Sequence, residues 1–140
     1  MRIMALDVGD SRIGVALSDP TEMLASPLTI IRRTNEASDV HTILDLIKEH
    51  AAGMLIVCLP LSLSGGAGAQ AEKVSDFATS LKSALQIPLE MVDERFSTVT
   101  AREFMRETAK KKSRIKKHDD AVAAAVILQG YLDENRPHNV

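Results

Sequence analysis

The sequence predicts an α/β fold in which a five-stranded mixed sheet carries helices on both faces. Strand-like segments follow one another without helical spacing over residues 3–31. Beyond residue 36, segments with apolar residues at helical spacing alternate with short aliphatic runs, an order typical of helices packed on parallel strands. The 140 residues are enough for one domain with its own hydrophobic core. We therefore expect a single domain over residues 1–140, with residues 135–140 as a flexible tail.

Three antiparallel strands, a meander, are expected at the start of the chain. An apolar run over residues 3–9 ends in Asp7-Val8-Gly9, and a second strand over residues 11–19 follows a tight turn. Residues 24–31 form the third predicted strand. Pro27 lies within it and has no amide hydrogen to donate. This strand is therefore expected at an edge of the sheet, or with an interruption at the proline.

The rest of the chain alternates helices with strands. The run at 54–59 is aliphatic without polar alternation, as expected of a central parallel strand that is covered on both faces. Gly53 is the predicted stop of the helix before it. The predicted elements are a helix over about 36–50, the strand over 54–59, a helix over about 70–86, a short strand over 88–93, a helix beginning near 98 and a closing helix over about 119–134.

Composition excludes several classes of protein. Cys58 is the only cysteine, so no internal disulfide can form, and its place in an aliphatic run is more typical of a small buried residue than of a nucleophile. No apolar run is long enough to span a bilayer, and the start of the chain has no signal-peptide pattern. We therefore expect a cytoplasmic protein without a membrane partner.

Basic residues are concentrated in one segment. The chain has 17 basic and 19 acidic residues, and six of the basic ones lie within residues 110–117, which we call the basic segment. Such a block is typical of a segment that binds a polyanion, although a solvated loop without a partner is the alternative. The predicted nucleic-acid contacts in the basic segment are Lys110, Lys111, Lys112, Arg114, Lys116 and Lys117.

Two aspartates stand in places where a soluble protein normally has apolar residues. Asp7 ends an aliphatic strand, and a desolvated carboxylate there must be paired, hydrogen-bonded or bound to a cation. Asp120 shares one face of the last helix with Ala124 and Ile127, which turns it toward the core. The structural alternatives are a turn cap for Asp7 and a helix cap for Asp120.

A further acid is expected at the end of the fifth strand. Asp93 and Glu94 are neighbours, so in an extended chain only one of them points to the face of Asp7. We favour Glu94, because the longer side chain reaches better across an intervening strand. Asp93 remains the alternative, and a surface ion pair of these acids with Arg95 would be a purely structural role.

Three carboxylates from separate elements are typical of a site for Mg²⁺ or Mn²⁺, which prefer oxygen ligands. Two such ions about 3.5–4 Å apart activate a water and stabilise the leaving oxygen of a phosphodiester. The predicted catalytic residues are thus Asp7, Glu94 and Asp120, with Asp93 as a further candidate, and the first three are the predicted metal ligands. The sequence predicts a metal-dependent nuclease whose basic segment holds the nucleic acid.

Several motifs, in order along nearly the whole chain, resemble the YqgF/RuvX family. They are Leu6-Asp7-Val8-Gly9, Arg12-Ile13-Gly14-Val15-Ala16, Ser18-Asp19-Pro20, Leu59-Pro60-Leu61, Asp93-Glu94-Arg95-Phe96-Ser97-Thr98 and Ile127-Leu128-Gln129-Gly130-Tyr131-Leu132. The resemblance implies an RNase H-like fold and links the chain to nucleolytic maturation of the 5′ end of 16S ribosomal RNA.

The same resemblance extends to site residues and partners. By position, the family's acids fall on Asp7, the pair Asp93 and Glu94, and Asp120. Apart from the resemblance, Arg12 and Arg95 are expected nucleic-acid contacts in addition to the basic segment. Precursor ribosomal RNA is favoured over branched DNA as the substrate, with ribosomal particles as a further candidate partner and a monomer or weak homodimer as the expected state.

Three other functions fit parts of the sequence. The protein could resolve four-way DNA junctions, or it could bind nucleic acid without cleaving it, in which case the acids are structural. Asp7-Val8-Gly9 also resembles the phosphate loop of actin-like ATPases and sugar kinases. Those enzymes enclose ATP between two such domains, and this chain has the length of one.

Overall fold

In the computed structural model, residues 1–59, 68–93 and 119–135 are described, except for the side chains of Asp119 and Asp120. Their elements are β1 (Arg2–Val8), β2 (Arg12–Ser18), β3 (Ala25–Arg32), α1 (Glu36–His50), β4 (Ala52–Leu59), α2 (Ala69–Ala84), β5 (Leu89–Asp93) and α4 (Asp119–Glu134). The expected helix near residue 98 and nearly all of the expected tail lie outside these ranges.

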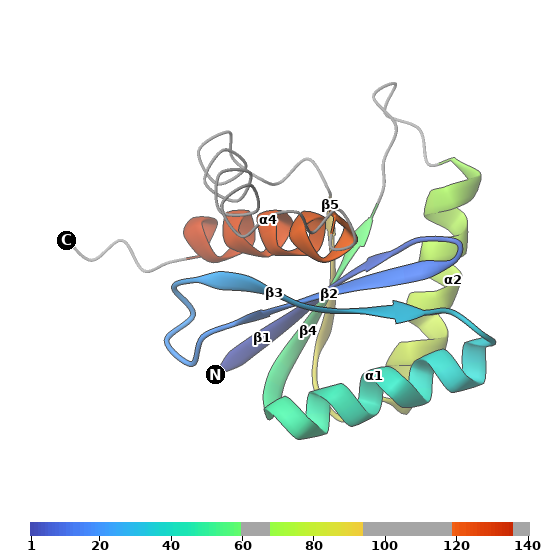
Figure 1. Ribbon diagram of the computed structural model, residues 1–140, viewed down its shortest axis with the longest axis horizontal. Coiled ribbons are helices and arrows are strands. Elements are labelled where there is room, and N and C mark those ends of the chain that lie inside the picture. Colours follow the sequence, from blue (N-terminus) through green and yellow to red (C-terminus); the bar gives the residue numbers. More distant parts are fainter. Residues whose placement is uncertain (60–67, 94–118, 136–140) are drawn as a thin grey trace.

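The five strands form one mixed sheet in the order β3-β2-β1-β4-β5. The first three strands pair antiparallel as a meander, and β4 pairs parallel with both β1 and β5. The predicted sheet is therefore confirmed, including the central place of β4. Figure 1 shows α4 on one face of this sheet and α1 with α2 on the other.

Pro27 lies both on an edge strand and at an interruption of the strand pairing, the two situations expected for it from the sequence. β3 is an edge strand, and the pairing register between β2 and β3 shifts between Val15 and Ala16, where Pro27 lies opposite Ala16. The missing amide donor of Pro27 thus falls at an irregularity of the ladder on an outer strand.

Each face of the sheet has its own apolar cluster. The cluster beneath α1 and α2 includes Met4, Leu6, Val57 and Phe77, all 2% exposed or less. The cluster beneath α4 includes Ala5, Cys58 and several residues of α4 itself. Because side chains alternate along a strand, odd-numbered residues of β1 face α4 and even-numbered ones face α1 and α2.

The predicted glycine stop after α1 is wrong. The helix ends at His50. Its C-cap residue Ala51 takes the left-handed conformation at φ 53° and donates its amide to the carbonyl of Lys48, while Gly53 lies inside β4. The strand begins directly after this cap, so the reversal is completed before the glycine is reached.

A buried ion pair connects α1 to the hairpin of β1 and β2. Asp39 is 2% exposed and accepts hydrogen bonds from Arg33 Nε at 3.1 Å and from the amide of Thr34 at 3.1 Å. Arg33 also donates from Nη1 to the carbonyl of Gly9 at 2.8 Å and lies 4.9 Å from the ring centroid of Phe77. One guanidinium thus contacts the β1–β2 turn, α1 and α2 together.

Replacing Asp39 should therefore destabilise the fold. We expect Asp39→Ala to lower the free energy of unfolding by about 2–3 kcal/mol in urea denaturation, since it strands a partly buried guanidinium. The exposed Asp45 on the same helix is the matched control, and Asp45→Ala should change this free energy by less than about 0.5 kcal/mol. Equal effects of both variants would contradict a structural role for the buried pair.

Candidate active site

Asp7 lies on the middle strand of the sheet, close to the end of β1, and is half-buried. By alternation it shares the face of Ile3 and Ala5, which are buried beneath α4. Its partner in β2 is Gly14, which has no side chain. On the other flank, Leu6 pairs with Val57, so the parallel register brings Cys58 beside Asp7. The carboxylate therefore stands between two small residues.

The face on which Asp93 lies, at the end of β5, follows from its neighbours in the strand. Val92 is buried beneath α4, whereas Leu89 and Met91 pack against the cluster of α1 and α2. Asp93, two residues after Met91, consequently lies on the face away from Asp7. Glu94 lies outside the described residues. The choice of Glu94 rather than Asp93 as a metal ligand therefore stays a prediction, which the position of Asp93 on the other face favours.

The first turn of α4 contains Asp120 and lies toward the end of the sheet where β1 finishes (Figure 1). Near the other end of the helix, Tyr131 contacts Met54, which pairs with Ile3 at the start of β1. From Ile3 to Asp7 the strand advances about 13 Å, and from Tyr131 back to Asp120 the helix advances about 16 Å. The backbone of Asp120 and the end of β1 are thus at similar heights along the sheet.

Gln129 fixes α4 to the connection between β2 and β3. Its side chain is 6% exposed, Oε1 accepts from the amide of Ala25 at 2.9 Å, and Nε2 donates to the carbonyl of Met23 at 2.9 Å. Nε2 also donates to Asp133 Oδ1 at 3.1 Å, within the helix. All of the amide's polar atoms are used, which holds the helix at one position along the strands.

The connection that Gln129 contacts is itself ordered by Asp19. Asp19 Oδ1 accepts from the amides of Met23 at 2.8 Å and Leu24 at 2.9 Å, and Oδ2 accepts from the amide and the hydroxyl of Thr21. The amide of Leu24, followed by the hydroxyl of Thr21, holds the pKa of Asp19 well below its usual range. The sequence did not predict the supporting roles of Asp19 and Gln129, although an aspartate before a proline is a signal for a turn.

Tyr131 makes the second attachment of α4, to β5. Its hydroxyl donates to Glu90 Oε2 at 2.9 Å. Burial, and next the hydrogen bond and charge of Glu90, raise the pKa of Tyr131 from 10.0 to about 12. The helix that carries Asp120 is thereby tied to the strand that precedes Glu94.

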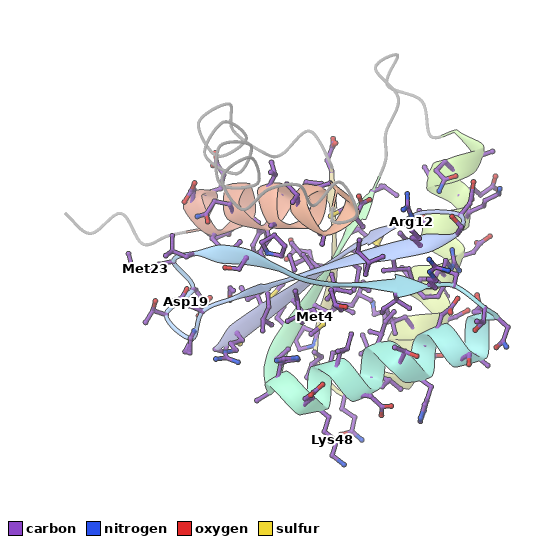
Figure 2. The ribbon with its side chains drawn as sticks, in the orientation of Figure 1. Met4, Arg12, Asp19, Met23 and Lys48 are labelled. Carbon is purple, nitrogen blue, oxygen red and sulfur yellow. The ribbon has the colours of Figure 1, made fainter. Side chains whose placement is uncertain are left out.

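The predicted substrate contacts are only partly within the described residues. Arg12 is exposed at the first position of β2, and Figure 2 shows it at the end of the strand remote from Asp19. Arg95 and the whole basic segment lie outside the described ranges. Within those ranges no group of three or more His, Cys, Asp or Glu side chains is arranged to hold a metal. Of the three predicted ligands only Asp7 has a described side chain, so the metal site stays a prediction.

The architecture is that of the RNase H-like proteins. RuvC from T. thermophilus, in a complex with a Holliday junction substrate, superposes with a TM-score of 0.66 at 12% sequence identity and covers 97% of both chains. A fowlpox virus resolvase with its Holliday junction DNA gives 0.60 at 11% identity, over 96% of this chain and 98% of that one. At these identities the likeness concerns the fold, and the predicted fold class is confirmed.

The chain belongs to the RuvX family. The family model, described as Holliday junction resolvase, matches residues 1–134. A protein of Roseiflexus sp. named "Putative pre-16S rRNA nuclease" is 47% identical over 96% of both chains. One of the same name from Dehalococcoides mccartyi is 49% identical over 93% of this chain and 96% of its own. The suspected family is thus confirmed. No helix in the described ranges is long and apolar enough to cross a membrane.

The attachment of α4 to β5 can be followed through Tyr131, the only tyrosine in a chain without tryptophan. We expect near-ultraviolet absorbance to show ionisation of Tyr131 near pH 12. Because this pKa is raised in the folded state, the associated stability is fully present below pH 10 and is lost as the pH rises through the folded value. Glu90→Gln should lower the midpoint but leave it above 10, since burial is the larger cause.

Circular dichroism at each pH shows whether the fold persists during this titration. Glu49→Gln, which removes an exposed charge from α1, is the matched control and should leave the midpoint unchanged. A midpoint near 10 in the folded wild-type protein would contradict the contact between Tyr131 and Glu90.

Proposed function

We propose that this protein is a metal-dependent nuclease that hydrolyses phosphodiester bonds during maturation of the 5′ end of pre-16S ribosomal RNA. The names of relatives more than 40% identical over nearly the whole chain support the substrate. The observation that carries the chemistry is a half-buried carboxylate, Asp7, between small neighbours on the face covered by α4. A carboxylate in that position is paired, hydrogen-bonded or bound to a cation, and metal binding is the role that we propose for it. Action on precursor ribosomal RNA implies a cytoplasmic protein.

The proposed metal site holds two Mg²⁺ or Mn²⁺ ions. Its proposed ligands are Asp7, Glu94 and Asp120, and Asp93 is the alternative to Glu94. The donor set is all carboxylate, which fits these hard cations. When bound, such ions supply a water activated for attack and stabilise the leaving oxygen. The protein's own part is to hold the carboxylates: β1 carries Asp7 on the middle strand, while Gln129 and Tyr131 fix α4, whose first turn contains Asp120.

The proposed substrate contacts are Arg12, Arg95 and the basic segment. A group of carboxylates repels a polyanion, and cationic side chains around it offset that repulsion. Precursor ribosomal RNA, free or in ribosomal particles, is the proposed partner, and we infer a monomer or weak homodimer.

Resolution of four-way DNA is the second candidate, and the description of the matching family as Holliday junction resolvase favours it. Labelled precursor rRNA and a four-way DNA junction, each incubated with and without Mg²⁺, distinguish the two substrates. Binding without metal-dependent cleavage of either would instead identify a non-catalytic nucleic-acid-binding factor.

Asp7 should be required for cleavage and not for folding. We expect Asp7→Asn to reduce the turnover of labelled precursor rRNA by roughly 100-fold or more, because the carboxylate that holds the charged reaction centre is lost. Its unfolding midpoint should match or slightly exceed that of the wild type, since one of several clustered negative charges is removed. Asp10→Asn, which neutralises an exposed acid three residues away, is the control and should cleave normally. Near-normal turnover of Asp7→Asn would contradict the assignment of Asp7 as a catalytic residue.

Metal binding should be visible without any substrate. Mg²⁺ or Mn²⁺ at about 100 times its dissociation constant should stabilise the folded protein by about 2.7 kcal/mol, seen as a higher melting temperature. Asp7→Asn should show a much smaller rise, and Asp10→Asn the full one. Undiminished cleavage in excess chelator would exclude the metal mechanism.

A further inference from the structure

Two arginines face each other across the outer hairpin of the sheet. Arg12 opens β2, Arg32 closes β3, and the register pairs them directly. Both are exposed. In an antiparallel pair, residues directly opposite have Cβ atoms about 5 Å apart, and like charges in that position destabilise the strands. Two guanidinium groups are thus available side by side at this end of the outer hairpin.

The pair lies on the same face of the sheet as Asp7. The next residues inward, Ile13 and Ile31, also pair with each other and are buried in the cluster beneath α1 and α2. Alternation therefore puts Arg12 and Arg32 on the opposite face, the one that Asp7 shares. Asp7 pairs with Gly14, two residues along β2 from Arg12. From strand spacing and rise, the Cα atoms of Asp7 and Arg12 are on the order of 8 Å apart.

The neighbouring arginine shows what a structural role looks like in this fold. Arg33 has an acidic partner in Asp39, a carbonyl acceptor in Gly9 and an aromatic contact. Arg32, on the other face, has no acidic partner within the described residues. The nearby acid of the turn, Asp10, forms an ion pair with Lys73 at 3.6 Å. The two consecutive arginines thus differ in environment, one neutralised inside and the other exposed opposite a second cation.

We propose that Arg32 and Arg12 together bind backbone phosphate of the substrate strand beside Asp7. This inference rests on the proposed nuclease function, and it adds Arg32 to the residues that bind the nucleic acid. The guanidinium fork matches phosphate oxygens in a bidentate geometry that an ammonium cannot reproduce. A phosphate between the two side chains can accept a charge-assisted hydrogen bond from each of them. The pair then anchors the strand on the face where the carboxylates act.

The first test measures binding as a function of salt. Arg32→Gln is compared with the wild type and with Lys48→Gln, which removes an exposed charge from α1 on the other face, remote from Arg12 (Figure 2). Binding of a fluorescent single-stranded RNA is followed in chelator, so that no metal-dependent cleavage interferes. We expect Arg32→Gln to reduce the log–log salt slope by about 0.7, whereas Lys48→Gln should not change it. Between 50 and 200 mM salt, the affinity ratio of wild type to Arg32→Gln should fall by about threefold.

The second test separates binding from folding. Because Arg32 is exposed, Arg32→Gln should leave the melting temperature without nucleic acid close to that of the wild type. Addition of RNA should raise the melting temperature of the wild type more than that of the variant. Arg32→Lys keeps the charge, so it should restore the salt slope while recovering only part of the affinity. In cleavage assays with Mg²⁺, KM should rise far more than kcat falls.

Three outcomes would overturn the inference. A salt slope of Arg32→Gln equal to that of Lys48→Gln means that Arg32 touches no phosphate. A melting temperature lowered in parallel with the affinity means that its role is structural. A wild type that binds no nucleic acid removes both the phosphate site and the proposed function. A wild type that binds with the expected slopes and never cleaves removes the nuclease proposal alone.

Discussion

Two polar contacts restrain the position of α4 along the sheet, in addition to its apolar packing. Ala121, Ala124 and Ala125 are fully buried and allow a close approach, and Leu128 and Leu132 are buried in the cluster beneath the helix. Gln129 adds a directional restraint through hydrogen bonds to the backbone of Ala25 and Met23. Tyr131 adds a second restraint at β5. These contacts help to set the height of Asp120 relative to Asp7.

The two faces of the sheet have different chemistry because strand side chains alternate. The face beneath α1 and α2 is closed by aliphatic residues and Phe77, and the ion pair of Arg33 with the buried Asp39 connects the hairpin turn to both helices. The other face has small residues around Asp7 and exposed arginines at the outer end of the hairpin. Adjacent residues can therefore have different roles: Arg33 stabilises the fold on one face, whereas Arg32 is exposed on the other.

Local patterns were enough to predict the sheet and the position of Asp7, because aliphatic runs, turn residues and an acid at a strand end are visible within a few residues. Contacts between distant segments were not predictable in this way. Gln129 meets Ala25 across more than a hundred residues, and nothing in the periodicity of α4 marks it. The burial of Asp39 depends on Arg33, and the helix stop moved from Gly53 to Ala51 because the strand begins at once. The predicted ligands Glu94 and Asp120 lie where no described side chain tests them.

The irregular pairing at Pro27 also affects how the sheet meets other molecules. An outer strand with a full row of free amides and carbonyls is a template on which a strand of another chain can add, the usual start of edge-to-edge aggregation. Here the outer strand β3 lacks one amide donor at Pro27, and its register with β2 shifts at the same point. At the opposite edge, β5 is only five residues long. The sheet is thus poorly suited to growth by strand addition at either side, which leaves its face as the surface for recognition.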